Sequence, residues 1–178
     1  MRNTILGKAT LLILGLVCLL GLASPAQDKA PQVPDALVLN VAEDYAQYQG
    51  LVVKCLSWLV STPSDVQIPE REELNAFVIL WLSGAPDITV DVTTDCMPFL
   101  KDHEDLFFTF LHGMALFQIK HPAENDPARL HEAGLEAVVF QVKETKCKRT
   151  PELKEILKAE RKGRLYEYAV ECSGAKSK

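Results

Sequence analysis

The residues best suited to chemistry form a short acidic cluster around one histidine. Asp102, His103, Glu104 and Asp105 follow one another in the chain. A carboxylate beside an imidazole is the pair that acid–base catalysis or a metal site would use. Consecutive side chains diverge around a helix start, however, and do not converge on one atom. The cluster therefore favours an acidic first turn of a helix, which Asp102 or Asp105 would cap.

His112 is a second candidate, because it lies inside a very hydrophobic segment, on a helix face with Phe108 and Leu116. A buried imidazole acts as a proton switch when a carboxylate lies nearby. The alternative is a core histidine with one satisfied hydrogen bond. No two of the four histidines stand three or four residues apart, so the sequence predicts no helical metal pair.

The sequence contains no G-x-S-x-G elbow and no phosphate-binding loop, so we predict no catalytic centre, cofactor or metal. A fold could still gather distant carboxylates with His103 or His112 in a deep pocket, which would indicate a hydrolase. The candidates for that role are Asp87, Asp91, Asp102, Glu104 and Asp105. If these carboxylates are instead spread over a flat or grooved surface, their arrangement favours a binding protein. The candidate functional residues are therefore Asp87, Asp102, His103 and His112.

The first 26 residues are typical of a signal peptide. Arg2 and Lys8 give a positive start, residues 11–22 are apolar, and residues 24–26 (SPA) supply the small side chains that a signal peptidase recognises. The apolar stretch is shorter than the roughly 20 residues that a membrane-spanning helix needs, so we expect cleavage after Ala26. The mature chain is therefore predicted to be secreted or periplasmic, with no stable membrane insertion.

Cys55, Cys96, Cys147 and Cys172 remain after this cleavage. An even number of cysteines in an exported chain indicates disulfides, and the lack of a C-x-x-C pair argues against a zinc ribbon or a thioredoxin-type motif. Four cysteines allow three pairings. We expect Cys55–Cys96 and Cys147–Cys172, because each bridge would then join neighbouring elements.

The charge balance argues against nucleic acid as a partner. Removal of the leader takes away two of the 19 basic residues and none of the 24 acidic ones, which leaves 17 against 24, or −7. A phosphate backbone is held by clusters of Lys and Arg. The longest basic run is the short stretch 146–149 (KCKR), so we expect no nucleic-acid binding.

Hydrophobic periodicity predicts an all-α fold that would position these residues. Segments beginning near Asp35, Glu70, Leu106, Asp126 and Thr150 repeat apolar residues every three or four positions. In one alternative, Gly50 divides the first segment into two helices. The second segment is apolar on nearly all sides, which is typical of a central helix. We predict that two helices come into close contact at Gly113, because glycine has no side chain. Residues 87–92 alternate polar and apolar, which predicts one short extended segment.

We therefore predict a compact bundle of five to seven helices with that one extended segment. It would form a single domain over residues 35–172. A flexible tether at 27–34 would precede the domain, and a disordered tail at 173–178 would follow it.

Several motifs resemble those of known secreted proteins: residues 58–63 (WLVSTP), Arg71, residues 75–78 (NAFV) and residues 81–90 (WLSGAPDITV). From about residue 50 to 170 the chain is similar to a group of uncharacterised secreted helical proteins of Bacteroidetes-type bacteria. A helix ending in Gly-x-x-Asp before a His-acidic stretch and a Phe-rich helix is also similar to small helical immunity proteins and periplasmic chaperones. The resemblance implies an exported helical fold and supplies no mechanism.

These features favour an exported, non-enzymatic helical protein that acts through contacts with an unidentified protein partner in the cell envelope. Two alternatives stay open. One is a carboxylate-dependent hydrolase built on the dispersed acidic residues. The other is a carrier of a small apolar ligand, which a large apolar cavity behind Phe108 and Trp81 would indicate.

Overall fold

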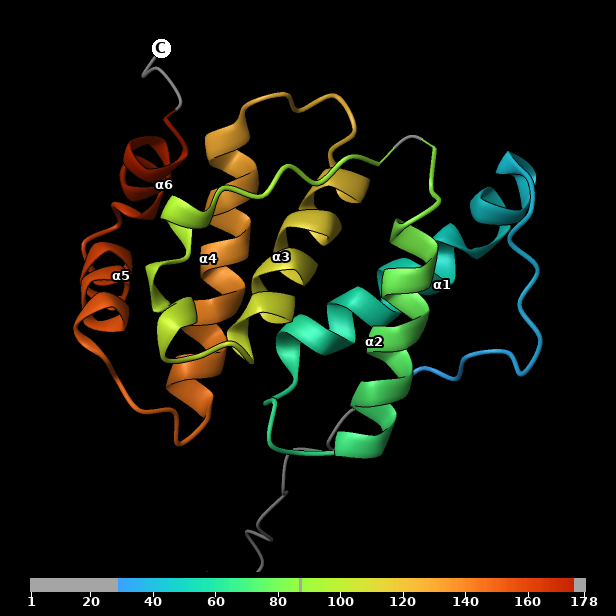
Figure 1. The fold of residues 1–178 in the computed structure, drawn as a ribbon, viewed down its shortest axis with the longest axis horizontal. Helices are drawn as coiled ribbons and strands as arrows, with labels where there is room; N and C mark the ends of the chain where they lie inside the picture. The colour runs from blue at the N-terminus through green and yellow to red at the C-terminus, as the bar shows by residue number, and fades with distance from the viewer. Residues whose placement is uncertain (1–28, 87, 175–178) are drawn as a thin grey trace, which may run out of the picture.

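The computed structural model describes residues 29–86 and 88–174. Over these ranges the chain forms six α-helices and two short 3₁₀ helices and contains no strand, which confirms the predicted all-α bundle (Figure 1). The predicted signal peptide, Asp87 and residues 175–178 of the predicted tail lie outside the described residues. No helix in the described ranges combines the length and the apolar character needed to cross a membrane.

The first helix, α1 (Ala42–Ser61), begins seven residues later than the predicted start at Asp35. The Asp44 carboxylate accepts hydrogen bonds from the backbone N–H groups of Asn40 and Val41, at 2.8 and 3.1 Å, and so fixes the start of the helix. The helix is continuous through Gly50. It ends at Ser61, two residues before Pro63, which lacks the N–H that would continue a helix.

The segment before α1 lies against the helices. Ala30 is buried, and Val33, Leu37 and Leu39 pack against the core formed by α1 and α2. The described part of the predicted tether therefore contacts the domain at Ala30 and Val33.

The second helix, α2 (Ile68–Leu82), packs on α1 through one face, with Leu74, Val78 and Trp81 buried. Its opposite face is solvent-exposed, and Leu80 is 53% exposed there. The prediction that this helix is central was therefore wrong, because its apolar residues on the outer face lack a neighbouring helix. Figure 1 shows α1 and α2 on one side of the bundle.

The centre of the bundle is formed by α3 (Leu106–Lys120) and α4 (Pro127–Glu144). The two helices approach closely at Gly113 and Gly134. A Cβ atom at Gly113 would lie 2.5 Å from the backbone oxygen of Ala133, and one at Gly134 would lie 2.8 Å from the Phe110 ring. The close contact predicted at Gly113 is confirmed.

The last two helices, α5 (Pro151–Arg161) and α6 (Leu165–Ser173), cover the other side of α4. The helix starts predicted near Asp126 and Thr150 are confirmed, and both residues cap their helices: their side chains accept from the N–H groups of Ala128 and Leu153. Because Ser173 ends α6, the predicted disordered tail does not begin there.

An extended segment is predicted over residues 87–92; residues 88–93 have no regular secondary structure and no strand pairing. In Figure 1 the segment runs from the α2 side over the ends of α3 and α4 to η1 (Thr94–Cys96), which η2 (Pro98–Lys101) follows. Val90 packs against the α1–α2 core and also against the α3–α6 core. The segment is thus an arm that ties the two halves together.

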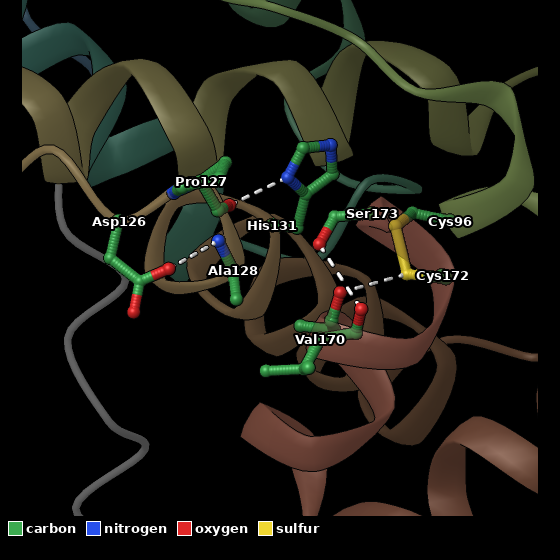
Figure 2. Close-up of a disulfide and its surroundings, with 9 residues drawn as sticks. Cys96, Asp126, Pro127, Ala128, His131, Val170, Cys172 and Ser173 are labelled. Carbon is green, nitrogen blue, oxygen red and sulfur yellow. Dashed lines mark hydrogen bonds between the residues drawn. A yellow bond between two sulfur atoms is a disulfide. The ribbon is translucent and has the colours of Figure 1, made fainter. Parts of the chain in front are cut away.

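One disulfide joins Cys96 in η1 to Cys172 in α6, 76 residues later (Figure 2). The predicted pairs Cys55–Cys96 and Cys147–Cys172 are wrong, because the fold brings Cys96 to the end of the last helix and not to Cys55. Helix α6 packs on η1, whereas Cys55 lies in the α1–α2 core and Cys147 lies between α4 and α5. Both of these cysteines are free.

Candidate functional site

The acidic cluster does not cap α3 as predicted. Asp105 occupies the N-cap position, but its backbone is helical (φ −61°, ψ −26°) and its side chain makes no capping hydrogen bond. The backbone oxygens of His103 and Glu104 accept from the N–H groups of Leu106 and Phe107 instead. Asp102, at the end of η2, is exposed.

The histidine of this cluster contacts a free thiol from a distant part of the chain. His103 Nδ1 lies 3.6 Å from Cys147 Sγ, in the loop between α4 and α5. His103 Nε2 lies 2.7 Å from the backbone oxygen of Lys148, which can only accept a hydrogen bond, so Nε2 carries the proton. Nδ1 is then an acceptor, but Cys147 Sγ also lies 4.0 Å from Nε2, so the sulfur lies beside the ring and not along the Nδ1 lone pair.

A thiol, an imidazole and a carbonyl that orients the imidazole lie together, but the sulfur is out of line with the acceptor nitrogen, so they do not form the aligned thiol–base pair of an activated nucleophile. Burial raises the pKa of the Cys147 thiol, the charge of Asp105 raises it further, and the charge of Arg149 lowers it. The thiol is therefore protonated near neutral pH. Its reaction as a nucleophile would require a base to take the proton.

Cys55, the other free cysteine, provides a contrast within the same chain. It has no solvent exposure, and burial raises its pKa to about 11. Such a thiol is inert in the folded protein, because only the thiolate reacts and no reagent reaches it.

His112 is a core residue, 2% exposed, whose ring stacks on Phe108 at 6.3 Å between ring centres. Burial and, second, the positive charge of Arg71 lower its pKa to about 3. Its Nε2 atom has no hydrogen-bond partner among the described residues. His112 is therefore neutral at mild pH, which does not support a proton switch near neutrality.

A buried polar junction, unforeseen from the sequence, lies beside His112 at the C-terminal end of α1. Arg71 donates from Nη1 to the oxygen of Leu59 (3.2 Å) and from Nη2 to the oxygens of Thr62 (2.5 Å) and Pro63 (3.2 Å). Gln141 on α4 donates to the same Thr62 oxygen at 2.8 Å. These side chains satisfy backbone acceptors that a helix end leaves open, so the junction has a structural role.

An open apolar groove of about 460 Å³ lies between α1, the C-terminal end of α2 and the C-terminal end of α3. Trp81 forms part of it and is held in place by a hydrogen bond from its Nε1 to the backbone oxygen of Tyr45 (2.9 Å). Ala46, Ala85 and Ile119 also line it. We call this feature the α1–α2–α3 groove.

Two further observations define this groove. Glu43 is its one charged lining residue among those described. Val41, the residue before Ala42, is exposed but does not line the groove. Phe108, which the sequence placed behind one cavity with Trp81, does not line this groove.

The candidate carboxylates stay dispersed in the part of the chain that the structure describes. Asp91, Asp102, Glu104 and Asp105 are all exposed, and none of them lines the α1–α2–α3 groove. Within the described ranges no three His, Cys, Asp or Glu side chains are arranged to hold a metal ion. Asp87 lies outside those ranges.

Comparison of the chain with protein-family models, curated protein sequences and solved structures gave no match. The resemblance to secreted helical proteins, immunity proteins and periplasmic chaperones therefore stays a prediction.

Proposed function

We propose that this chain is an exported helical module that binds an apolar segment of another envelope protein in the α1–α2–α3 groove. The single observation that carries the proposal is the groove, whose walls are side chains of Trp81, Ile119 and Tyr45. Apolar side chains that enter such a groove leave water, which contributes about 25 cal/mol per Å² of buried apolar area.

The charge of the groove narrows the chemistry of the partner. Glu43 lies at an otherwise uncharged surface, and the predicted mature chain has a net charge of −7 (17 basic against 24 acidic residues). Complementary charges speed association and select partners. The partner segment is therefore apolar and flanked by Lys or Arg.

Two features support export. The first 26 residues match the pattern of a cleaved leader. The Cys96–Cys172 disulfide is typical of proteins that fold in an oxidising compartment.

The proposal is tested with a matched pair of substitutions at exposed alanines. Ala46→Arg places a cation in the groove, whereas Ala76→Arg places it on the outer face of α2. Each purified protein is used to capture partners from the envelope fraction of the source cell, after equal thermal stability has been verified. We expect a protein that the wild type and the A76R variant retain and the A46R variant loses. Equal retention by both variants would contradict the proposal.

A small-ligand carrier is the second candidate, because about 460 Å³ falls within the volume range of ligand sites. Native mass spectrometry of the purified protein distinguishes a small-ligand carrier from a protein that binds a partner segment. A bound small molecule that disappears in the A46R variant, with no protein captured, would replace the proposed function by the carrier.

A further inference from the structure

The longest basic run of the chain, residues 146–149 (KCKR), lies in the loop between α4 and α5 (Figure 1). Its three cations, Lys146, Lys148 and Arg149, are all exposed. None of the residues in this loop lines the α1–α2–α3 groove. A role of the loop is therefore independent of the proposed function.

The backbone of this loop is accessible to an endoprotease. Within the described residues, no hydrogen bond joins the backbone of residues 146–149 to another backbone group. An endoprotease binds its substrate as an extended segment through the backbone N–H and C=O groups, so such a segment is cut more readily than a helix. Exposed loops are the usual sites of these cuts.

The turn between α5 and α6 provides a comparison within the chain, because Lys162 and Arg164 are also exposed there. The backbone N–H groups of these two residues donate to the oxygens of Lys158 and Ala159 in α5, at 3.3 and 2.9 Å. Cleavage at that turn would require the end of α5 to unwind. Backbone hydrogen bonding, and not the exposure of basic side chains, therefore distinguishes the two connections.

The contacts within the loop restrict two of its three candidate peptide bonds. His103 Nε2 donates to the Lys148 oxygen at 2.7 Å, so this carbonyl is not available to the oxyanion hole of a protease. Arg149 is followed by Thr150, which is buried and caps α5. The bond that follows Lys146 has neither restriction.

We propose that the bond between Lys146 and Cys147 is a processing site, at which an exported endoprotease selective for Lys or Arg hydrolyses the folded chain. The reaction consumes one water molecule. The water oxygen bonds to the carbonyl carbon of Lys146 as the C–N bond breaks, which leaves a carboxylate on Lys146. Both hydrogens of the water end on the nitrogen of Cys147, which becomes an ammonium group.

The disulfide holds the two pieces together after this cut. Cys96 lies before the cut and Cys172 after it, so one covalent bridge joins the pieces. The second piece also packs through Leu153, Ile156 and Ala169 into the core that α3 and α4 share. Processing at the loop therefore gives a two-chain molecule.

The test treats purified, oxidised protein with a low concentration of trypsin, as a probe that selects Lys and Arg, and maps the products by mass spectrometry. We expect the first cut within residues 30–174 to follow Lys146 and its two pieces to separate only after reduction. The Lys146→Gln variant should lose this cut by at least about tenfold, because a pocket built to pair with a cation rejects a neutral side chain. Lys162→Gln, in the α5–α6 turn, should be cut after Lys146 at the wild-type rate. A first cut elsewhere in that range, or equal rates in K146Q and the wild type, would overturn the proposal.

Replacement of His103 tests which bond is cut. His103→Ala removes the hydrogen bond to the Lys148 oxygen, so cuts after Lys148 should join those after Lys146 among the first products. Asp102→Ala, at an exposed neighbour, should keep the wild-type pattern. A wild-type pattern in H103A would overturn the assignment of the bond.

The protein recovered from the source cell tests whether the processing occurs there. A form that separates after reduction into two pieces, the second starting at Cys147, is the expected result. Recovery of the exported protein with residues 146 and 147 always joined would overturn the proposal.

Discussion

Arg71 on α2 donates a hydrogen bond from Nη2 to the backbone oxygen of Thr62, so a side chain of one helix closes the C-terminal end of another. The guanidinium also lies over the Trp58 ring, 5.4 Å from its centre. Its hydrogen bonds to Leu59, Thr62 and Pro63 all go to backbone oxygens. The fan of five N–H donors suits this task, because a lysine has one charged nitrogen and cannot reach three separated acceptors in the same way.

Replacement of this arginine by Arg71→Met should lower the free energy of unfolding by about 3 kcal/mol, because it leaves buried backbone oxygens without their donors. Urea denaturation measures the loss. Arg129→Met is the control: Arg129 pairs with Glu132 at the surface, where an ion pair contributes less than about 1 kcal/mol. Equal losses in the two variants would mean that the junction contributes no more than a surface pair.

His112 should make stability depend on pH. Its pKa falls from 6.5 to about 3 in the folded chain, so below pH 6.5 the unfolded state binds a proton that the folded state does not. Stability from this group is therefore complete above pH 6.5 and declines as the pH falls toward 3. At pH 5 the loss should be about 2 kcal/mol.

The measurement compares unfolding free energies at pH 8 and pH 5 for the wild type and the His112→Gln variant. The wild type should lose about 2 kcal/mol more than the variant between these values. Identical slopes in the wild type and H112Q would show that His112 is not the group responsible.

Removal of the disulfide by the double substitution Cys96→Ser and Cys172→Ser should cost about 4 kcal/mol, because the closed loop spans 76 residues of separation. Thermal unfolding under non-reducing conditions measures the change. Cys147→Ser should cost much less, since its sulfur is free and half-buried. Thiol titration of the unfolded, unreduced protein without its leader (residues 27–178) should find two thiols, Cys55 and Cys147. Four thiols, or none, would contradict the assigned bridge.

The close approach of α3 and α4 should make Gly113→Ala destabilising by about 1–3 kcal/mol, because the added Cβ meets the Ala133 oxygen. Gly50→Ala is the matched control in α1. Its Cβ would meet no atom within 4 Å, so the substitution should stabilise the helix by about 0.5–1 kcal/mol. Opposite signs for the two variants are expected in chemical denaturation; a neutral Gly113→Ala would mean that the helices can separate without cost.

Local signals predicted most of the helices. The starts at Pro127 and Pro151 depend on a capping side chain and on a proline within the first turn, both of which the sequence displays. The start of α1 was misplaced because Asp35 is a favourable capping residue by type, whereas the helix is fixed by Asp44 in its first turn, whose carboxylate accepts from backbone N–H groups before the helix. The central position assigned to α2 failed for a related reason: an apolar helix face does not reveal whether a neighbour covers it.

The contacts between side chains far apart in the chain depend on the tertiary fold, and no local sequence pattern predicts them. Cys96 meets Cys172 because α6 packs on η1, and His103 meets Cys147 across 44 residues of chain. The sequence drew attention to His103 through its acidic neighbours, but its hydrogen-bond partner is the backbone oxygen of Lys148, and the Cys147 thiol lies beside its ring. Arg71 could have been noticed as the one basic residue on the buried stripe of α2, with Leu74, Val78 and Trp81.

The central claim is that the α1–α2–α3 groove holds a segment of a partner protein, and site-specific photocrosslinking in the source cell tests it most directly. A photoreactive amino acid is placed at Ala46, inside the groove, or at Ala76, on the outer face of α2. We predict a discrete adduct from position 46 whose crosslinked peptide is apolar and flanked by Lys or Arg, with no such adduct from position 76. The same adducts from both positions, or none from position 46, would contradict the claim.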